Sequence, residues 1–315
     1  MKLEERMHQV KSEVDEALLR FFAKKRQEAK RIHPSTVALV DQVADLTLRA
    51  GKRVRPFLCW VGYQAVTRQD DSGNPRGDSR NQQLMAVMVG LELFQSFALI
   101  HDDIMDQDKL RRGKPSVHEK FRLTVFDSGL TRNLARAIHY GESMGILAGD
   151  LALVWADEEM SVVFDSGNPR DSRNLVMVYR QMKEEVVYGQ ALDVMREADA
   201  SDVAQERVDE LKTAWYSVVR PLQIGSCLAQ FPESSVYHPR FREFQRVWEA
   251  WGVPAGMLFQ LRDDFLDGAI DEKTFKKKAE VLRNIADQAV SDAVITDHTR
   301  ALLLDIVQFV CTRKS

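Results

Sequence analysis

Apolar residues recur along this chain at the spacing of an α-helix. Near the start, Val10, Val14, Leu18 and Phe21 fall every three or four residues, which places them on one face of an amphipathic helix. Further runs with the same period cover approximately residues 134–160, 174–198, 207–230, 241–267 and 273–313. No series of alternating strands with turn signals and no strand–helix–strand rhythm interrupts them. The pattern therefore predicts an all-α protein.

Turn-forming residues mark the expected breaks between these helices. His33-Pro34-Ser35 interrupts the first helical run, and Ser35 is expected to cap the next helix. Residues 71–76, 127–129 and 165–170 are rich in Asp, Ser, Gly, Asn and Pro, which favours loops. Their irregular spacing and different flanks argue against a solenoid repeat.

Composition and charge narrow the class of protein. The chain has 315 residues, enough to bury a core as one large domain or two small ones. A net charge of -3 gives no sign of a nucleic-acid or anionic-membrane partner. The longest apolar stretch, Leu84 to Ile100, contains Glu92, Gln95 and Ser96. These polar residues favour a buried helix, so no membrane span is expected.

The three cysteines and the N-terminus indicate a cytoplasmic protein. Cys59, Cys227 and Cys311 are far apart and show neither CxxC nor Cys/His spacing. They therefore predict neither a disulfide framework nor a zinc site, and a reducing compartment is the simplest interpretation. Residues 1–6 have no apolar core, which argues against a signal peptide.

Two acidic clusters carry the strongest chemical signal. The first is Asp102-Asp103-Ile104-Met105-Asp106, and the second, Asp263-Asp264-Phe265-Leu266-Asp267, repeats its spacing. On a helix the first and last Asp of each cluster lie one turn apart on the same face. Both clusters follow an apolar run, so both are expected at the ends of buried helices. Oxygen-only ligands suit a hard ion such as Mg²⁺, and six carboxylates facing one another would hold several ions.

Basic residues complement these carboxylates. Lys52, Arg53 and Arg55 form a compact group before an apolar helix, and Arg111 and Arg112 supply two guanidinium groups that match phosphate oxygens. Lys212-Thr213 adds an ammonium and a hydroxyl. Acidic clusters for metal together with basic clusters for phosphate predict a diphosphate substrate.

The order of these motifs resembles that of the trans-type polyprenyl diphosphate synthases. The first motifs are Gly51-Lys52-Arg53-Val54-Arg55-Pro56, His101 with residues 102–106, and Arg111-Arg112-Gly113-Lys114-Pro115. The later motifs are Gly189-Gln190 with Asp193, Lys212-Thr213-Ala214-Trp215-Tyr216-Ser217, and Phe259-Gln260-Leu261-Arg262 with residues 263–267. The resemblance covers approximately residues 35–267 and a plausible final helix. It implies one helical bundle of the isoprenoid synthase type, residues 1–315, around a central active-site cavity.

The resemblance also implies a role for each matching residue. Two Mg²⁺ ions are expected on Asp102 and Asp106 with Asp103 nearby, and a third on Asp263, Asp264 and Asp267. The allylic diphosphate is expected at Arg111, Lys212, Thr213 and Gln260, and Gln190 and Asp193 match a further motif near the metals. Isopentenyl diphosphate is expected at Lys52, Arg55, Gln95 and Arg112. The implied catalytic set is Asp102, Asp103, Asp106, Lys212 and Asp263.

The implied reaction is a condensation without a nucleophilic side chain. The allylic starter (dimethylallyl, geranyl or farnesyl diphosphate) ionises, isopentenyl diphosphate attacks the cation, and the departing diphosphate takes the proton. Phe97 lies five residues before Asp102, roughly 7.5 Å deeper along a helix, beside the small Ala98. An aromatic ring there is expected to stop the chain at C15 or C20.

One departure from the family keeps other readings open. Residues 268–272 lead almost directly into the final helix, where the family has a lysine-bearing loop. Lys273, Lys276, Lys277 and Lys278 are candidates to replace those lysines. The alternatives are a non-catalytic subunit that modulates a synthase and, with less support, a class I terpene cyclase. The resemblance also implies a homodimer, formed through residues 84–100 and 134–155.

Overall fold

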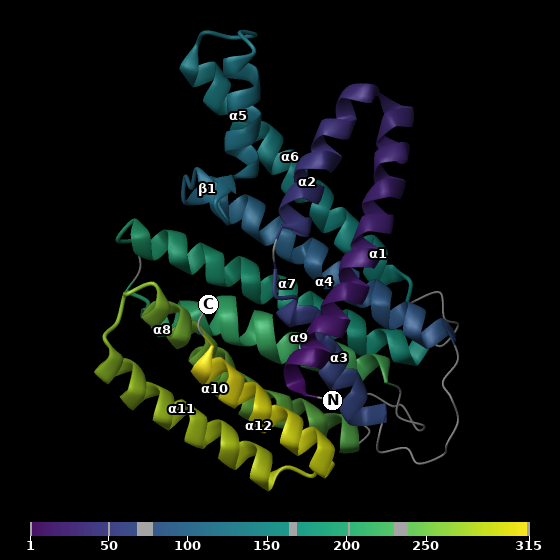
Figure 1. The fold of residues 1–315 in the computed structure, drawn as a ribbon, viewed down its shortest axis with the longest axis vertical. Coiled ribbons are helices and arrows are strands. Elements are labelled where there is room, and N and C mark those ends of the chain that lie inside the picture. Colours follow the sequence, from purple (N-terminus) through teal and green to yellow (C-terminus); the bar gives the residue numbers. More distant parts are fainter. Residues whose placement is uncertain are drawn as a thin grey trace. The chain divides into compact units, whose positions relative to one another are not determined.

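The described part of the chain is helical throughout, apart from one short hairpin. A computed structural model describes residues 2–49, 51–67, 78–163, 169–200, 202–229 and 239–313. In these ranges helices follow one another along the chain, and the hairpin pairs strands of two residues each (Figure 1). The prediction of an all-α protein is therefore confirmed.

The chain divides into two compact units. The first-motif unit comprises Gln9–Pro56 and Met85–Val162 and contains the Asp102 cluster. The second-motif unit comprises Met1–His8, Phe57–Leu84 and Val163–Ser315 and contains the Asp263 cluster. The expectation of one domain over residues 1–315 stays a prediction.

The first-motif unit is built on two long helices and the shorter elements packed with them. Its elements are most of α1 (Leu3–Ile32) and of α4 (Asp78–Met105), with η1 (Pro34–Thr36), α2 (Val37–Leu48), β1 (Leu110–Arg111), β2 (Lys114–Pro115), α5 (Val117–Asp127) and α6 (Leu134–Ser161). The apolar stripe predicted on the first helix is buried, and Phe21 packs edge-on against Trp155 of α6. α6 runs along α5 and also contacts α2. The periodic apolar positions of the sequence therefore form this core.

The break after α1 differs from the prediction. Ser35 does not cap α2, because Pro34 opens a 3-10 turn that contains it. The Ser35 N–H donates to the His33 ring (3.2 Å), and α2 begins only at Val37. Thr36 stands at the N-cap, but its hydroxyl donates back to the carbonyl oxygens of Ala29 and His33, each at 2.8 Å. The side chains of this segment therefore close the turn.

The second-motif unit packs around α10. Its elements are most of α3 (Val54–Thr67), α7 (Pro169–Glu197), α8 (Gln205–Asp209), the π-helix η3 (Glu210–Val219), α9 (Arg220–Leu228), α10 (Pro239–Leu266), α11 (Glu272–Asp292) and α12 (Asp297–Thr312). Figure 1 shows α10, α11 and α12 side by side, and α10 also contacts η3. Trp248 and Trp251 are fully buried, and the Trp248 indole donates to the Ser226 hydroxyl (2.7 Å).

Two predicted helices are divided in the structure. The run at 207–230 consists of α8, η3 and α9, because ten residues adopt π-helical pairing. The run at 273–313 breaks at Ala293, whose extended backbone ends α11. Thr296 then caps α12 by accepting from the Thr299 N–H (3.2 Å). The cap at Thr296 therefore starts a second helix, where apolar periodicity alone predicted a single continuous helix.

Two further predictions concern loops and the membrane. Ser128 and Gly129 form the expected turn after α5, with Gly129 at a φ of 73°, whereas residues 71–76 and 165–168 lie outside the described residues.

Among the described helices, Asn81–Met105 is long and apolar enough to cross a membrane. However, 61% of its most apolar window is buried within the protein, as expected for a core helix.

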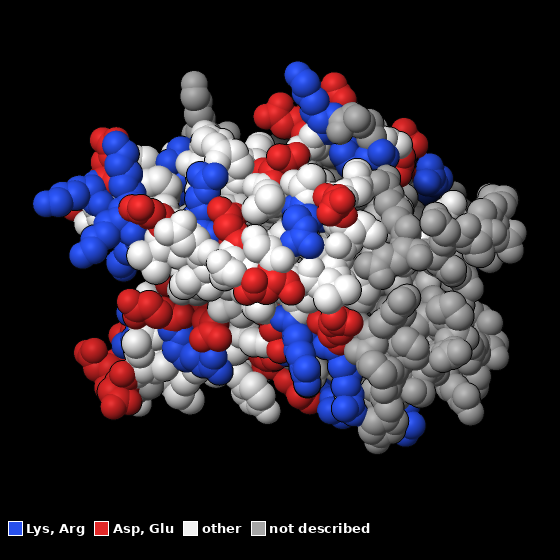
Figure 2. Space-filling model, turned by 90° about the horizontal axis from the view of Figure 1, so that it is seen from below, with Lys and Arg blue, Asp and Glu red and all other residues white. Residues whose placement is uncertain are grey.

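Acidic and basic side chains are intermixed on the face of the molecule shown in Figure 2. Many of the exposed pairs form along single helices, such as Lys276 with Glu272 and Arg283 with Asp287. Pairs of this kind contribute little to stability. Together with the net charge of -3, this mixture gives that face no extended field of one sign.

Candidate active site

The first aspartate motif lies where α4 ends. The Asp106 N–H donates to the Asp102 carbonyl (2.9 Å), so the helical turn continues to Asp106. The side chains of Asp102 and Asp106 therefore leave the same face, as the sequence predicts. Asp106 is exposed and Asp102 is partly exposed. These two carboxylates present only oxygen donors, which fits a hard cation that keeps water and phosphate oxygens in its shell.

Asp103 faces the interior of the unit. Its side chain is fully buried, and Oδ1 accepts from Arg111 Nε (2.5 Å). Burial raises the pKa of Asp103 to about 6, although the Arg111 guanidinium acts in the opposite direction. Oδ2 is buried without a hydrogen-bond partner in the described part of the chain. Asp103 therefore differs from Asp102 and Asp106 because its side chain is fully buried.

A hairpin turn brings Arg111 back to the motif. β1 pairs with β2, and the turn between them has left-handed backbone at Arg112 (φ 53°) and Gly113 (φ 73°). Besides Asp103, Arg111 contacts Asp102 and Asp108, each at 3.3 Å. Arg111 thus joins three carboxylates, and Asp108 is a member that the sequence analysis did not identify.

Several arginines lie unusually close together in the first-motif unit. The pKa of Arg112 is lowered, first by burial and then by the positive charges of Arg53, Arg55 and Arg111, while Glu92 acts in the opposite direction. The guanidinium groups of Arg53, Arg55 and Arg111 therefore lie close enough to Arg112 to act on its charge. Such a cluster is suited to an anion that carries several negative charges.

Arg53 has a different environment from the rest of the basic group. It is buried, and its guanidinium pairs with Asp15 (2.7 Å) and Glu92 (2.6 Å). Lys52, by contrast, is exposed, and Arg55 is half-buried. The compact group expected from sequence therefore divides into one buried cation that pairs with Asp15 and Glu92 and two cations at or near the surface.

An aromatic row on α4 leads to the first motif. The Phe97 ring lies 5.2 Å from Phe94 and 4.9 Å from the ring of His101, measured between centroids. His101 is seated against Gly149 of α6, where an added Cβ would lie 2.2 Å from ring atoms. Only glycine allows this approach. Phe97, Ala98 and Gln95 are all partly exposed, so none is sealed in the core.

The second motif repeats the geometry of the first. The Asp267 N–H donates to the Asp263 carbonyl (2.9 Å), which continues the last turn of α10. Gln260 connects this motif to the π-helix, since its Oε1 accepts from the Thr213 hydroxyl (3.0 Å) and its Nε2 donates to Asp264 (2.9 Å). The structure thus joins Thr213 and Gln260, which the sequence assigned to the allylic diphosphate, with Asp264, which it assigned to a metal ion.

Close packing of α10 on η3 makes this connection possible. At Gly256 an added Cβ would lie 2.4 Å from Ala214 Cα, so a larger residue would separate the two helices. Gln260 follows one turn later on the same face and meets Thr213. Within a π-helix the side chains are displaced from α-helical register, an arrangement that often marks functional sites.

Lys212 and Gln190 complete the polar set on α7 and η3. Lys212 Nζ donates to Asp193 (2.8 Å). Burial acts to raise the pKa of Asp193. The hydrogen bonds and charges of Lys212 and Arg196 outweigh this effect, so the pKa of Asp193 is lowered. Gln190 Nε2 is buried without a hydrogen-bond partner among the described residues. An amide donor in that state is suited to a ligand oxygen.

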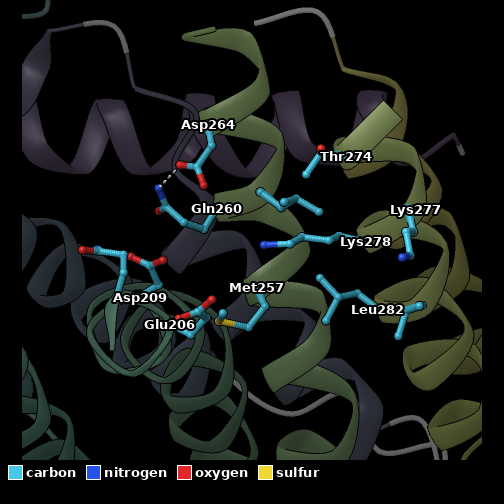
Figure 3. A pocket seen from close by; sticks show the side chains of 12 residues that line it. Glu206, Asp209, Met257, Gln260, Asp264, Thr274, Lys277, Lys278 and Leu282 are labelled. Atoms are coloured by element: carbon cyan, nitrogen blue, oxygen red, sulfur yellow. Dashed lines mark hydrogen bonds between the residues drawn. The ribbon is translucent and has the colours of Figure 1, made fainter. Parts of the chain in front are cut away.

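A pocket of about 670 Å³ borders Gln260 and Asp264 (Figure 3). Its lining comes from α8, α10 and α11 and includes Glu206, Asp209, Met257, Thr274, Lys277, Lys278 and Leu282. Figure 3 shows Lys278 extending from α11 into the pocket. Of the four lysines proposed from sequence, Lys276 pairs with Glu272 (2.6 Å), whereas Lys277 and Lys278 line the pocket.

The predicted site residues thus form two sets, one in each unit. The first-motif unit holds Lys52, Arg55, Gln95, Phe97, Ala98, Asp102, Asp103, Asp106, Arg111 and Arg112, and the second-motif unit holds Gln190, Asp193, Lys212, Thr213, Gln260, Asp263, Asp264 and Asp267. In the described ranges, no three His, Cys, Asp or Glu side chains are grouped closely enough to hold a metal by themselves. A hard ion at either motif would therefore need oxygen atoms from a ligand or water.

Comparison with known proteins establishes the family. The sequence profile of the polyprenyl synthetase family matches residues 37–300, so the chain belongs to that family. A short chain isoprenyl diphosphate synthase of Methanocaldococcus jannaschii is 29% identical over 233 residues, 74% of this chain and 58% of that protein. The farnesyl diphosphate synthase of Geobacillus stearothermophilus is 28% identical over 277 residues, 85% of this chain and 76% of that protein.

Two further findings describe the extent of these similarities. The chain spans 58% and 64% of the lengths of the short chain isoprenyl diphosphate synthases of Methanocaldococcus jannaschii and Methanothermobacter thermautotrophicus. The fold is similar to that of a geranylgeranyl pyrophosphate synthase from Corynebacterium glutamicum, complexed with isoprenyl diphosphate and magnesium. The TM-score is 0.79 at 23% identity, and the match covers 99% of this chain and 100% of that one.

Proposed function

We propose that this chain is a Mg²⁺-dependent prenyltransferase that condenses isopentenyl diphosphate with an allylic diphosphate. The starter is dimethylallyl, geranyl or farnesyl diphosphate, and the product is a trans-prenyl diphosphate of C15 to C20. The observation that carries the proposal is that a member of the polyprenyl synthetase family has two aspartate motifs, each ending a helix and each in contact with an arginine. A cytoplasmic location belongs to the same proposal.

In this proposal the metal ions bind to carboxylates of both aspartate motifs. Asp102 and Asp106 hold two Mg²⁺ ions, and Asp263, supported by Asp264 and Asp267, holds a third. When bound, Mg²⁺ supplies positive charge that stabilises a diphosphate as it leaves. The i, i+4 placement of the outer carboxylates in both motifs supports this assignment.

The cations are assigned to the two diphosphates. Arg111, Lys212, Thr213 and Gln260 hold the allylic diphosphate, with Gln190 and Asp193 beside them. Lys52, Arg55, Gln95 and Arg112 hold isopentenyl diphosphate. Burial and the charges of Arg53, Arg55 and Arg111 lower the pKa of Arg112, and bound phosphate oxygens would offset both effects, which supports an anion site there.

The chain's own residues then promote ionisation and protect the cation. Cationic side chains lower the energy of the departing diphosphate, so the allylic C–O bond breaks. The double bond of isopentenyl diphosphate attacks the allylic cation, and the diphosphate removes the proton that restores an allylic product. The aromatic row that includes Phe97 supplies an apolar wall that excludes water, which would otherwise quench the cation.

The proposal is tested by incubating the purified protein with labelled isopentenyl diphosphate, each starter in turn and Mg²⁺, then sizing the products. A C15 or C20 diphosphate that disappears with EDTA supports the synthase. A cyclic hydrocarbon formed from an allylic diphosphate alone would instead indicate a terpene cyclase. A folded protein that forms no product until a second synthase is added would indicate a modulatory subunit.

Replacing Phe97 with Ala is expected to lengthen the product by at least one isoprene unit. The Phe97 ring lies five residues before Asp102 and packs against Phe94 and His101, so its removal opens space along α4. Chromatographic sizing of the products from a single starter measures the change. Phe126→Ala, at an exposed ring of α5, is the matched control. An unchanged length in the Phe97 variant would contradict the assignment.

A homodimer formed through residues 84–100 and 134–155 completes the proposal, and α6 contains the second of these segments. Tyr140, Leu147 and Val154 recur every seven residues and are all exposed, so they form an apolar stripe on one face of α6. Replacing Leu147 and Val154 with Arg is expected to convert a dimer to a monomer. Light scattering after size exclusion measures the mass, with Ile285→Arg on α11 as the control. A variant that keeps the mass of two chains would place the interface elsewhere.

A further inference from the structure

Arg313 contacts the second aspartate motif from the position that follows α12. Its side chain is only 4% exposed. One guanidinium nitrogen, Nη2, donates to Asp263 Oδ1 at 2.5 Å. This contact joins residues 50 positions apart in sequence, and it involves the carboxylate assigned above to the third metal ion. No sequence motif draws attention to Arg313.

The position of Arg313 is set by three other contacts. Its Nη2 also donates to the Phe259 carbonyl (3.2 Å), and its guanidinium lies 4.0 Å from the centroid of the Phe259 ring. Its own backbone carbonyl accepts from the side chain of Arg262, with Nε at 2.9 Å. These contacts hold the arginine beside α10 independently of Asp263. Among these contacts of the Arg313 side chain within the described residues, the pair with Asp263 is the one for which a ligand at the motif would compete.

The first motif has a comparable arrangement. Arg111 pairs with Asp102 and Asp103, as Arg313 pairs with Asp263. In both motifs an arginine therefore pairs with a carboxylate of the motif. A carboxylate is stabilised by a nearby cation, and at each motif a guanidinium is the cation that the chain itself supplies.

We propose that Arg313 is the counter-cation of the second motif, which holds Asp263 in the metal-free protein and leaves it when a divalent cation binds. The inference rests on the proposed metal site at Asp263. A metal ion at Asp263 Oδ1 would compete with the hydrogen bond from Arg313, and two cations at one carboxylate repel each other. Arg313 therefore opposes metal binding. After release it remains beside α10 through Phe259, where it can meet an oxygen of the diphosphate.

The test measures Mn²⁺ affinity by the electron paramagnetic resonance signal of the free ion, without any turnover. Arg313→Met keeps an apolar side chain over Phe259 and is expected to bind Mn²⁺ about tenfold more tightly. This is the change expected when one charge-assisted hydrogen bond to Asp263 no longer competes with the metal ion. Arg313→Gln is the second variant, and circular dichroism checks that each is folded. Arg283→Met, at an exposed pair with Asp287, is the control and is expected to leave the affinity unchanged.

The effect must also depend on Asp263. In an Asp263→Asn background, Arg313→Met is expected to have no effect on Mn²⁺ affinity, which a double-mutant cycle measures directly. Unchanged or weaker binding in folded Arg313→Met, while Asp263→Asn does weaken binding, would overturn the inference alone. Mn²⁺ binding that is insensitive to Asp263→Asn would show that the metal assignment in the proposed function is wrong, and the inference would fail with it.

Discussion

Replacing Asp102 with Asn is expected to lower kcat about 10³-fold, the loss typical of removing one group that stabilises charge in a transition state. Asp102 shares the last turn of α4 with Asp106, so the substitution removes one negative oxygen donor from a two-carboxylate site. It also leaves Arg111 with its contacts to Asp103 and Asp108, so the hairpin should keep its place. Initial rates of product formation at saturating Mg²⁺ measure the loss.

The control for this prediction is Asp41→Asn. Asp41 pairs with Arg26 on the surface, and both side chains are more than two-fifths exposed. The same change of charge there is expected to leave the rate unaltered. A folded Asp102→Asn protein that keeps most of its activity and still loses it with EDTA would show that the metal is held elsewhere.

Replacing Arg53 with Met is expected to lower the free energy of unfolding by about 3–5 kcal/mol, the cost of breaking a buried ion pair from one side. The Arg53 side chain is 2% exposed and that of Glu92 is 7% exposed, so the Glu92 carboxylate would remain buried without its cation. Asp15, which is partly exposed, loses its partner as well. Urea denaturation followed by circular dichroism measures the change.

Arg20→Met provides the matched control for Arg53. Arg20 pairs with Glu16 along α1, with side chains 71% and 68% exposed, and its loss should change stability by less than about 1 kcal/mol. If Arg53→Met unfolds at the wild-type urea concentration but loses activity, Arg53 contacts a substrate instead. That result would restore the sequence-based grouping of Arg53 with Lys52 and Arg55.

The features predicted well from sequence are those that depend on local periodicity. The stripe from Val10 to Phe21 identifies the buried face of α1, because a 3.6-residue repeat is visible within one helix. The relation between Asp102 and Asp106 follows from the same geometry, since residues four apart share a face. The resemblance to a known family added what periodicity cannot, namely which of many charged residues belong to a site.

The features that sequence did not predict arise from contacts between distant segments. Arg53 is adjacent to Lys52 in sequence, yet Arg53 is buried and meets Asp15 and Glu92, which come from α1 and α4, whereas Lys52 is exposed. Arg313 reaches Asp263 only because α12 packs beside α10. The π-helix around Lys212 and Thr213 was missed for a different reason, because its apolar positions differ little from those of an α-helix over ten residues.

Ionisation of the allylic C–O bond by this chain is tested most directly with a starter that carries fluorine at C2. Fluorine withdraws electrons from the allylic cation but leaves the size of the substrate nearly unchanged. With Mg²⁺ and isopentenyl diphosphate, the fluorinated starter is expected to form product about 100-fold more slowly than the natural one, equivalent to ~3 kcal/mol in the barrier. Equal rates for the two starters would contradict ionisation as the step that these carboxylates and cations promote.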